Sequence, residues 1–245
     1  MAGSAVRVVS LVPSLTEAVA VSVPGALVGA TEWCSHPEDL DDLGVVRVGG
    51  TKNPDVRRIV GLAPDLVIAN EEENRAPDLA ALRAAGVEVL VTEVRDLPGA
   101  FRELARVLAA CGAGRPGWLD EAEAAWGRLP EPETRLKAVI PIWRRPWMVL
   151  GHDTFAGDLL RRLGVDNAYA THAERYPRVP IEELRAVAPD VVVLPDEPYR
   201  FTRKDGPEEF TTPSALVSGR HLTWYGPSLT EAPAVLGVAL RAACR

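Results

Sequence analysis

The chain has 245 residues, of which 47% are hydrophobic and 25% are charged, and its formal net charge is -7. This composition is typical of a globular protein long enough for one large or two modest α/β domains. The acidic balance and the lack of a basic stripe exclude a nucleic-acid backbone as partner. No stretch approaches the roughly 20 apolar residues of a membrane helix, so we expect no membrane span.

The spacing of the cysteines and the first residues of the chain both indicate in which cellular compartment the protein works. Cys34, Cys111 and Cys244 are widely spaced and form no CxxC pair, so we expect free thiols in a reducing environment. Met1–Ala5 is followed directly by the strand-like run Val6–Val12, which does not have the form of a secretory signal. The printed sequence predicts a cytoplasmic monomer, or a periplasmic or extracellular protein if a signal peptide was removed.

The first half predicts alternating strands and helices. The apolar run Val6–Val12 predicts a strand, and the helix after it is expected to have Ser14 as N-cap and Glu17 at the third helical position. The other strands predicted in this half are Ala26–Thr31 and Val87–Thr92.

An internal repeat links the two halves. Residues 57–68 (RRIVGLAPDLVI) and 182–193 (EELRAVAPDVVV) align without a gap at an offset of 125 residues. In each copy a short amphipathic helix ends before Ala-Pro-Asp, because proline disfavours helical geometry in the residue before it. The continuous apolar run that follows is typical of a strand buried on both faces of a parallel sheet.

The second half continues the pattern. Trp147–Leu150 predicts a strand, taken as the counterpart of Val6–Val12, and Asp153 is expected to cap a helix that runs to about Leu163 and stops at Gly164. Strong helix formers over Trp118–Arg128 predict a helical connector.

The predicted architecture is α/β, with two similar lobes that each contain a parallel sheet. We expect an N-terminal lobe over residues 1–113, a helical linker over 114–133 and a C-terminal lobe over 134–245. Ligands of open parallel sheets bind beyond the carboxyl ends of the strands. The sequence therefore predicts a ligand cleft between the lobes.

Six stretches in chain order carry a family resemblance: VVSLVPSLTEAV, LVGATEWCSHP, VGGTKNPDV, IVGLAPDLVIANEEEN, GHDTFAGDLLRRLGVDN and YPRVPIEEL. They resemble the helical-backbone metal-receptor group, the class III substrate-binding proteins that carry cobalamin, haem or iron-siderophores to ABC importers. The likeness is greatest to the cobalamin-binding branch. It implies two Rossmann-like lobes joined by a helix, and non-enzymatic binding of a metal-chelate molecule (cobalamin-like, haem or an iron-siderophore) with no required cofactor.

The resemblance also implies aromatic ligand contacts at Trp33, Trp143, Tyr176 and Trp224. Large rings suit a flat or macrocyclic ligand, and packing within the lobes is the alternative role for them. Thr51 and Asn70 stand where cobalamin binders have two further tryptophans. The ligand is therefore expected to differ from intact cobalamin.

Polar candidates lie on predicted loops. The carboxylates of Glu71 and Glu72, with that of Glu73, suit a cation or a polar ligand, or cap the next helix. Arg144 lies between tryptophans and suits a carboxylate or phosphate on the rim of a ligand, or is simply solvated. The long polar loop Pro198–Phe210 is interpreted as a mobile flap.

Cys34 and His36 are predicted as candidate ligands of a metal ion, since thiolate and imidazole are metal ligands. The alternative is that Cys34 is a buried thiol and His36 a hydrogen-bonded histidine, both with structural roles. A metal-dependent enzyme using Cys34, His36 and the Glu71–Glu73 loop is the second functional hypothesis, and a scaffold for a partner is the third. The chain lacks nucleophile-elbow, phosphate-loop, zinc-protease and dinucleotide motifs. We therefore expect a binding protein and not an enzyme.

The resemblance implies one glutamate on each lobe that docks onto arginines of an importer. The internal repeat places these positions at Arg57 and Glu182. Arg57 reverses the charge, and like charges at an interface are costly, although Asp55 is a possible substitute. With the missing signal, Arg57 disfavours an ABC importer as partner without excluding it.

Overall fold

The computed structural model describes residues 6–243, so Cys244 and the leading Met1–Ala5 lie outside the described part of the chain. Contacts between residues divide the chain into two compact units of three segments each. The first unit comprises Met1–Glu93, Phe101–Asp120 and Tyr225–Pro227. The second comprises Val94–Ala100, Glu121–Trp224 and Ser228–Arg245.

The division into two units has more boundaries along the chain than the two that the sequence predicts, at residues 113 and 134. Val94–Ala100 groups with the second unit, and Tyr225–Pro227 groups with the first. Helix α5, Gly117–Gly127, lies within the predicted linker, and its residues are divided between the units. The helical connector is confirmed, whereas the domain boundaries stay a prediction.

The first unit is built on a parallel five-stranded sheet with the order β3-β2-β1-β6-β7. Its strands are β1 Val8–Ser10, β2 Leu27–Ala30, β3 Val46–Arg47, β6 Leu66–Asn70 and β7 Val89–Thr92. The strands predicted over Val6–Val12, Ala26–Thr31 and Val87–Thr92 are thus confirmed, each somewhat shorter. Between β3 and β6 the chain forms a two-stranded hairpin, in which β4 Gly49–Gly50 pairs with β5 Asn53–Pro54.

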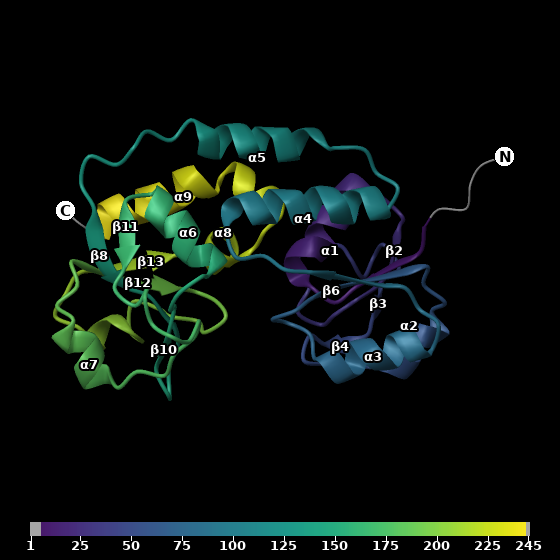
Figure 1. The fold of residues 1–245 in the computed structure, drawn as a ribbon, viewed down its shortest axis with the longest axis horizontal. Coiled ribbons are helices and arrows are strands. Elements are labelled where there is room, and N and C mark those ends of the chain that lie inside the picture. The colour runs from purple at the N-terminus through teal and green to yellow at the C-terminus, as the bar shows by residue number, and fades with distance from the viewer. Residues whose placement is uncertain (1–5, 244–245) are drawn as a thin grey trace. The chain divides into compact units, whose positions relative to one another are not determined.

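Helices cover both faces of this sheet: α2 and α3 lie on one face, and α1 and α4 on the other (Figure 1). Their bounds are α1 Pro13–Ser22, α2 Val56–Gly61, α3 Ala76–Ala84 and α4 Leu97–Ala110. Ile59 of α2 and Leu82 of α3 pack in one core with Val9 and Val67 of the sheet. Because both faces are covered, the ends of the strands are where a ligand can reach the sheet.

The second unit repeats this plan on a parallel four-stranded sheet with the order β11-β8-β12-β13. Its strands are β8 Leu136–Val139, β11 Val165–Asn167, β12 Val191–Pro195 and β13 Ser214–Val217. Helix α7 lies on one face and α6, α8 and α9 on the other (Figure 1). Their bounds are α6 Phe155–Arg162, α7 Ile181–Ala186, α8 Gly219–Thr223 and α9 Ala232–Ala243. An antiparallel hairpin, β9 Pro141–Trp143 with β10 Met148–Val149, follows β8.

The predicted repeat is confirmed down to single hydrogen bonds. Helices α2 and α7, and strands β6 and β12, have bounds that differ by the same 125 residues. In the first copy the Asp65 carboxylate accepts from the Arg7 backbone N–H at 2.8 Å, and in the second the Asp190 carboxylate accepts from the Lys137 N–H at 2.7 Å. The aspartate of each Ala-Pro-Asp motif therefore fastens the helix–strand loop to the start of the neighbouring strand.

Both copies also place an alanine in left-handed geometry after the helix, with φ of 46° at Ala63 and 47° at Ala188. A side chain there is strained by roughly 1–2 kcal/mol, and glycine is not. We expect Ala63→Gly and Ala188→Gly each to raise the free energy of unfolding by about 0.5–1 kcal/mol, measured by urea denaturation. Ala80→Gly within α3 should instead lower it by about 1 kcal/mol, and a loss at all three sites would contradict the strain argument.

Two predicted helix caps are wrong by one or two residues. Helix α1 has Val12 as N-cap and makes no side-chain cap hydrogen bond; Ser14 lies inside it because Pro13, with its fixed φ, begins the helix. Helix α6 is capped by Thr154, whose hydroxyl accepts from the Gly157 N–H, and not by Asp153, whose φ of 51° lies outside the extended region of an N-cap. The predicted end of α6 at Gly164 is confirmed, with φ of 84°.

The predicted counterpart of the first strand is also wrong. Trp147–Leu150 contributes only β10, which pairs antiparallel with β9 outside the main sheet. The true counterpart of β1 is β8, because β8 lies beside β12 as β1 lies beside β6. Both runs are apolar, and only strand pairing distinguishes them.

Candidate functional site

Three loops meet at the carboxyl edge of the first sheet. The loop after β2 is tied to the β4–β5 hairpin by the Glu32 N–H, which donates to the Gly49 carbonyl at 2.9 Å. The Asn74 side-chain amide donates to the Thr51 carbonyl at 2.9 Å, which joins the loop after β6 to the same hairpin. The Lys52 ammonium donates to the Glu72 carbonyl and adds a second link. This edge is therefore one fixed surface made from distant parts of the sequence.

Trp33 projects from this surface with 68% of its area exposed. Its indole nitrogen would lie 3.4 Å from a Cβ built on Gly50, so the ring is close to the hairpin. A residue with a side chain at Gly50 would also meet the Asn53 carboxamide. The role of Trp33 as a ligand contact stays a prediction, and the structure gives it an accessible ring on a fixed loop.

Cys34 and His36 do not form the start of a metal site. The Cys34 thiol is fully buried and lies 3.0 Å from the Thr16 hydroxyl and 3.1 Å from the Thr31 hydroxyl. Burial raises the pKa of Cys34, against the opposing effect of these hydrogen bonds, so the thiol stays protonated. His36 Nδ1 contacts the Ser35 hydroxyl.

Within residues 6–243 no group of three or more His, Cys, Asp or Glu side chains is arranged to hold a metal ion. The expected metal site, including the Glu71–Glu73 loop, is therefore not assembled. Cys34 and Cys111 are both free and buried, as expected from their spacing, and Cys244 lies outside the described residues.

The acidic run is a turn organised by asparagines. The Asn70 side-chain oxygen accepts from the N–H groups of Glu72 at 2.9 Å and Glu73 at 3.3 Å, while the Asn74 oxygen accepts from the Asn70 N–H. Asn70 itself is buried. Asn70, considered only as a lost tryptophan in the sequence, thus has a structural role of its own. Glu71 is exposed and Glu72 is half-buried, and ligand binding by either stays a prediction.

Burial raises the pKa of the half-buried Glu73 from 4.5 to about 7, with Lys52 opposing the shift. The folded state then holds the proton more tightly than the unfolded chain, so stability falls as the pH rises from about 4.5 to about 7. We expect Glu73→Gln to remove this pH dependence and to stabilise the fold above pH 7 by about 1–3 kcal/mol. Urea denaturation at pH 5 and pH 8 measures it. The exposed Glu88→Gln should change stability by less than about 0.5 kcal/mol at either pH, and equal behaviour of the two variants would contradict the prediction.

In the second unit, the exposed Trp143 and the half-buried Tyr199 form an aromatic pair. Trp143 ends β9 and is 42% exposed, and its ring meets the Tyr199 ring edge to face, with centroids 5.6 Å apart and an interplanar angle of 75°. Tyr199 follows β12 at the carboxyl edge of the second sheet. The sequence marked the loop that contains Tyr199 but did not identify this residue; its position soon after the strand was the available signal.

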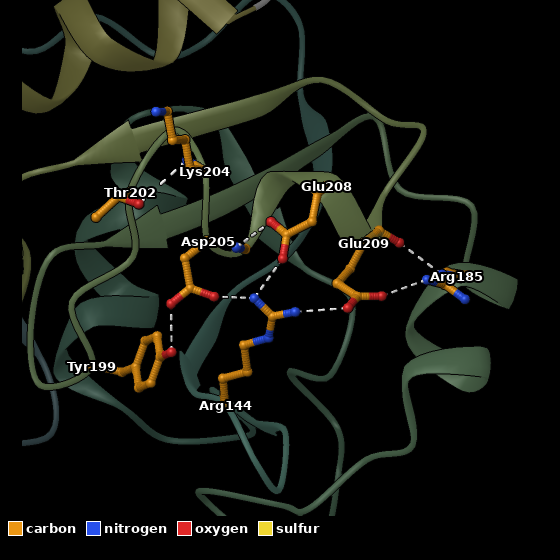
Figure 2. A network of polar contacts seen from close by, with 9 residues as sticks. Arg144, Arg185, Tyr199, Thr202, Lys204, Asp205, Glu208 and Glu209 are labelled. Atoms are coloured by element: carbon orange, nitrogen blue, oxygen red, sulfur yellow. Dashed lines mark hydrogen bonds and ion pairs between the residues drawn. The ribbon is translucent and has the colours of Figure 1, made fainter.

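Among the predicted ligand contacts, Arg144 has the environment that differs most from the one the sequence predicts. Figure 2 shows its guanidinium enclosed by Asp205, Glu208 and Glu209. The guanidinium contacts Glu208 at 2.5 Å and Glu209 at 2.7 Å, it is also paired with Asp205, and the side chain is 7% exposed. It also lies over the Trp147 ring, 5.3 Å from its centroid. A guanidinium already bound by three carboxylates is not free for the rim of a ligand.

The same contacts change the interpretation of the loop Pro198–Phe210. Arg144 binds three of its carboxylates, and Arg185 of α7 adds a 2.7 Å contact to Glu209. The loop's Phe201 stacks on Trp147 at 6.0 Å. The segment is thus held in place by charge and packing and is not a free flap. Trp147 is partly buried and packs against two clusters of the core.

The remaining predicted aromatic contacts are less accessible. Trp224 is 7% exposed, and its side chain hydrogen-bonds the Glu197 carboxylate. Burial and then Asp196 raise the pKa of Glu197, while the bond from Trp224 lowers it. Tyr176 is half-buried beneath the Arg175 guanidinium, 5.7 Å from its ring centroid. The roles of both aromatics as ligand contacts stay predictions.

Arg57 and Glu182 occupy the same place in the first turns of α2 and α7, and both are exposed. The charge at this repeated position is therefore opposite in the two units. Asp55, considered as a substitute carboxylate, accepts from the Arg58 N–H at 3.0 Å as the N-cap of α2.

Comparison with known proteins places the chain in a family. The family model described as periplasmic binding protein matches residues 8–216. A vitamin B12-binding protein of Vibrio parahaemolyticus is 24% identical over 192 residues, which cover 76% of this chain and 69% of the relative. One from Pectobacterium atrosepticum is 22% identical over 241 residues, covering 91% and 84%.

Solved structures agree on the fold. The periplasmic vitamin B12-binding protein of Vibrio cholerae superposes with a TM-score of 0.75 at 19% identity, covering 97% of each chain. A periplasmic haem-binding protein of a Roseiflexus species gives 0.80 at 22% identity, covering 99% of this chain and 100% of the other. Among the described residues, no helix combines the length and apolar character needed to cross a membrane. Because one family model spans most of its length, the chain belongs to the periplasmic binding protein family, whose two-lobed α/β fold it shares.

Proposed function

We propose that this protein binds, without catalysis, a metal-chelate small molecule of the cobalamin, haem or iron-siderophore class. The observation that carries the proposal is the exposure of two tryptophans, Trp33 at 68% on a fixed loop and Trp143 at 42% at the end of hairpin strand β9. Rings held in this way provide a large apolar contact area at a small cost in side-chain entropy. The relatives named as vitamin B12-binding and haem-binding proteins support the same ligand class.

Exposure of these rings needs an explanation beyond folding. Tryptophan is highly buried on average, and tryptophan rings are enriched at binding interfaces. Trp118 and Trp126, in contrast, turn their indole N–H groups to partners within their own units, Ser22 and Leu229. Trp118 and Trp126 thus contribute to the packing of their own units, whereas Trp33 and Trp143 are exposed and can stack on a ligand.

Within that class, the proposed ligand is smaller or less aromatic in its contacts than intact cobalamin. Thr51 stands at one expected tryptophan position, and its carbonyl is bound by Asn74. Asn70 stands at the other position; it is buried, and its side-chain oxygen accepts a hydrogen bond within its own turn. The surface has fewer rings than the resemblance implies for a cobalamin binder, so haem and iron-siderophores remain candidates.

Three probes test the proposal: cyanocobalamin, haemin and a ferric siderophore. After incubation and desalting, the protein should retain the absorbance of at least one probe. The same probe should raise the melting temperature, because a ligand at 100 times its Kd stabilises the folded state by about 2.7 kcal/mol. Metal ions alone, such as zinc or ferrous iron, serve as the control. Retention of none of the three probes would refute the proposal.

We further propose that docking onto an ABC importer is weakened by Arg57. The argument rests on the family resemblance, which implies a carboxylate at this exposed position, and on the cost of opposing like charges. A cytoplasmic location stays a prediction, and the family favours the periplasm instead; fractionation of cells that produce the protein distinguishes them.

Arg57→Glu should therefore increase stimulation of a reconstituted corrinoid or haem importer roughly tenfold or more. The assay is ATP hydrolysis by the importer with ligand-loaded protein. Arg58→Glu, one residue along the same helix and also exposed, is the matched control and should have little effect. Strong stimulation by the unchanged protein, lost in Glu182→Ala, would show that docking does not need a carboxylate at residue 57.

A further inference from the structure

The exposed ring of Trp143 would turn freely if nothing constrained its side-chain torsions. Its backbone is fixed, because Trp143 pairs with Met148 across the β9–β10 hairpin. The hairpin does not set the angle of the indole, which is 42% exposed. The Trp143 ring contacts the Tyr199 ring edge to face, with centroids 5.6 Å apart.

Tyr199 is in turn held by charge. Its hydroxyl donates to one oxygen of the Asp205 carboxylate at 2.6 Å, and the other oxygen is paired with Arg144 (Figure 2). Arg144 directly follows Trp143 in the sequence. The contacts therefore form a closed ring that runs from Trp143 through Tyr199 and Asp205 to Arg144. We call Arg144, Asp205 and Tyr199 the positioning circuit. Its base is rigid because Arg144 is also bound by Glu208 and Glu209.

We propose that Tyr199 and Asp205 are positioning residues that fix the angle of the Trp143 ring before a ligand arrives. The inference rests on the proposed function, in which the Trp143 ring stacks on the ligand. A ring that is already ordered loses less entropy on binding, which strengthens binding without any new contact to the ligand. The circuit thus gives the buried Arg144 a part in recognition although it touches no ligand itself.

Simple packing is the competing explanation for Tyr199, since its ring also contacts Phe201 at 4.7 Å. Tyr199→Phe separates the two explanations, because it keeps both ring contacts and removes only the hydroxyl that reaches Asp205. Asp205→Ala breaks the same link from the other side, and it leaves Arg144 paired with two carboxylates. Neither change removes a buried apolar side chain, so both variants should fold.

The test is a double-mutant cycle on affinity for whichever of haemin, cyanocobalamin and the ferric siderophore the protein retains, measured by quenching of tryptophan fluorescence. Tyr199→Phe and Asp205→Ala should each weaken binding roughly two- to tenfold. In a Trp143→Ala background, Tyr199→Phe should have no further effect, because the ring it positions is absent. Near-UV circular dichroism of the ligand-free protein should change in Asp205→Ala, which alters no aromatic residue of the chain. Arg135→Ala, which breaks the exposed pair with Asp166, is the control and should match the unchanged protein.

The outcomes separate this inference from the proposed function. If Trp143→Ala weakens binding but Tyr199→Phe does not, the positioning role is wrong and the ligand site stands. A loss in Tyr199→Phe that persists in the Trp143→Ala background would also overturn the positioning role. If the unchanged protein binds none of the three probes, or Trp143→Ala binds the retained probe normally, the Trp143 site fails and the positioning role fails with it.

Discussion

Replacing Trp33 or Trp143 with alanine is expected to weaken ligand binding by roughly 1–3 kcal/mol, which is about a 5- to 150-fold rise in Kd. Both rings are exposed, Trp33 on a fixed loop and Trp143 at the end of strand β9, so the loss falls on the ligand contact and little on the core. The melting temperature should change little, because neither ring fills a buried cavity. Titration with the probe that the protein retains, followed by absorbance, measures the effect.

The controls come from the same protein. Leu43 is 61% exposed in the first unit, and Leu43→Ala should leave the affinity unchanged, which shows that loss of an exposed apolar side chain is not enough. Trp126 is 5% exposed, and Trp126→Ala should lower stability by roughly 3–5 kcal/mol through the cavity it leaves. Normal binding by both Trp33→Ala and Trp143→Ala, or unfolding of both, would show that these rings are packing residues.

Arg144→Ala should be the most destabilising single change among the charged residues. It leaves the carboxylates of Asp205, Glu208 and Glu209 facing one another without their shared cation. Breaking a fully buried ion pair costs about 3–5 kcal/mol. Because these carboxylates are 31–45% exposed, water screens part of that cost, and we expect a loss of about 2–3 kcal/mol in the free energy of unfolding.

Two measurements check this expectation. Urea denaturation gives the stability, and limited proteolysis reports whether the loop Pro198–Phe210 becomes accessible. Arg144→Lys retains the charge but not the planar fork that binds several carboxylates, so its loss should be intermediate. Arg135→Ala, in an exposed pair, should cost less than about 1 kcal/mol. If Arg144→Ala is no more harmful than Arg135→Ala, the loop is held by its aromatic packing and not by charge.

Local patterns were enough for the alternation of strands and helices and for the repeat. Ala-Pro-Asp ends a helix and starts a strand in both halves through backbone sterics that act within a few residues, so α2, β6, α7 and β12 were predictable. The helical connector followed from intrinsic propensity for the same reason. The accessible tryptophans Trp33 and Trp143 came from their family positions after strands.

What the sequence could not decide depends on partners that are distant along the chain. Whether Arg144 faces a ligand or its own protein is set by acidic residues more than sixty positions later, and single-sequence patterns carry no information about that pairing. The choice of β8 over β10 as the counterpart of β1 depends on strand pairing, since both runs are equally apolar. Cys34 illustrates the same limit: metal-ligating chemistry was evident from its residue type, but its burial between two threonine hydroxyls, which keeps the thiol protonated, exists only in the folded chain.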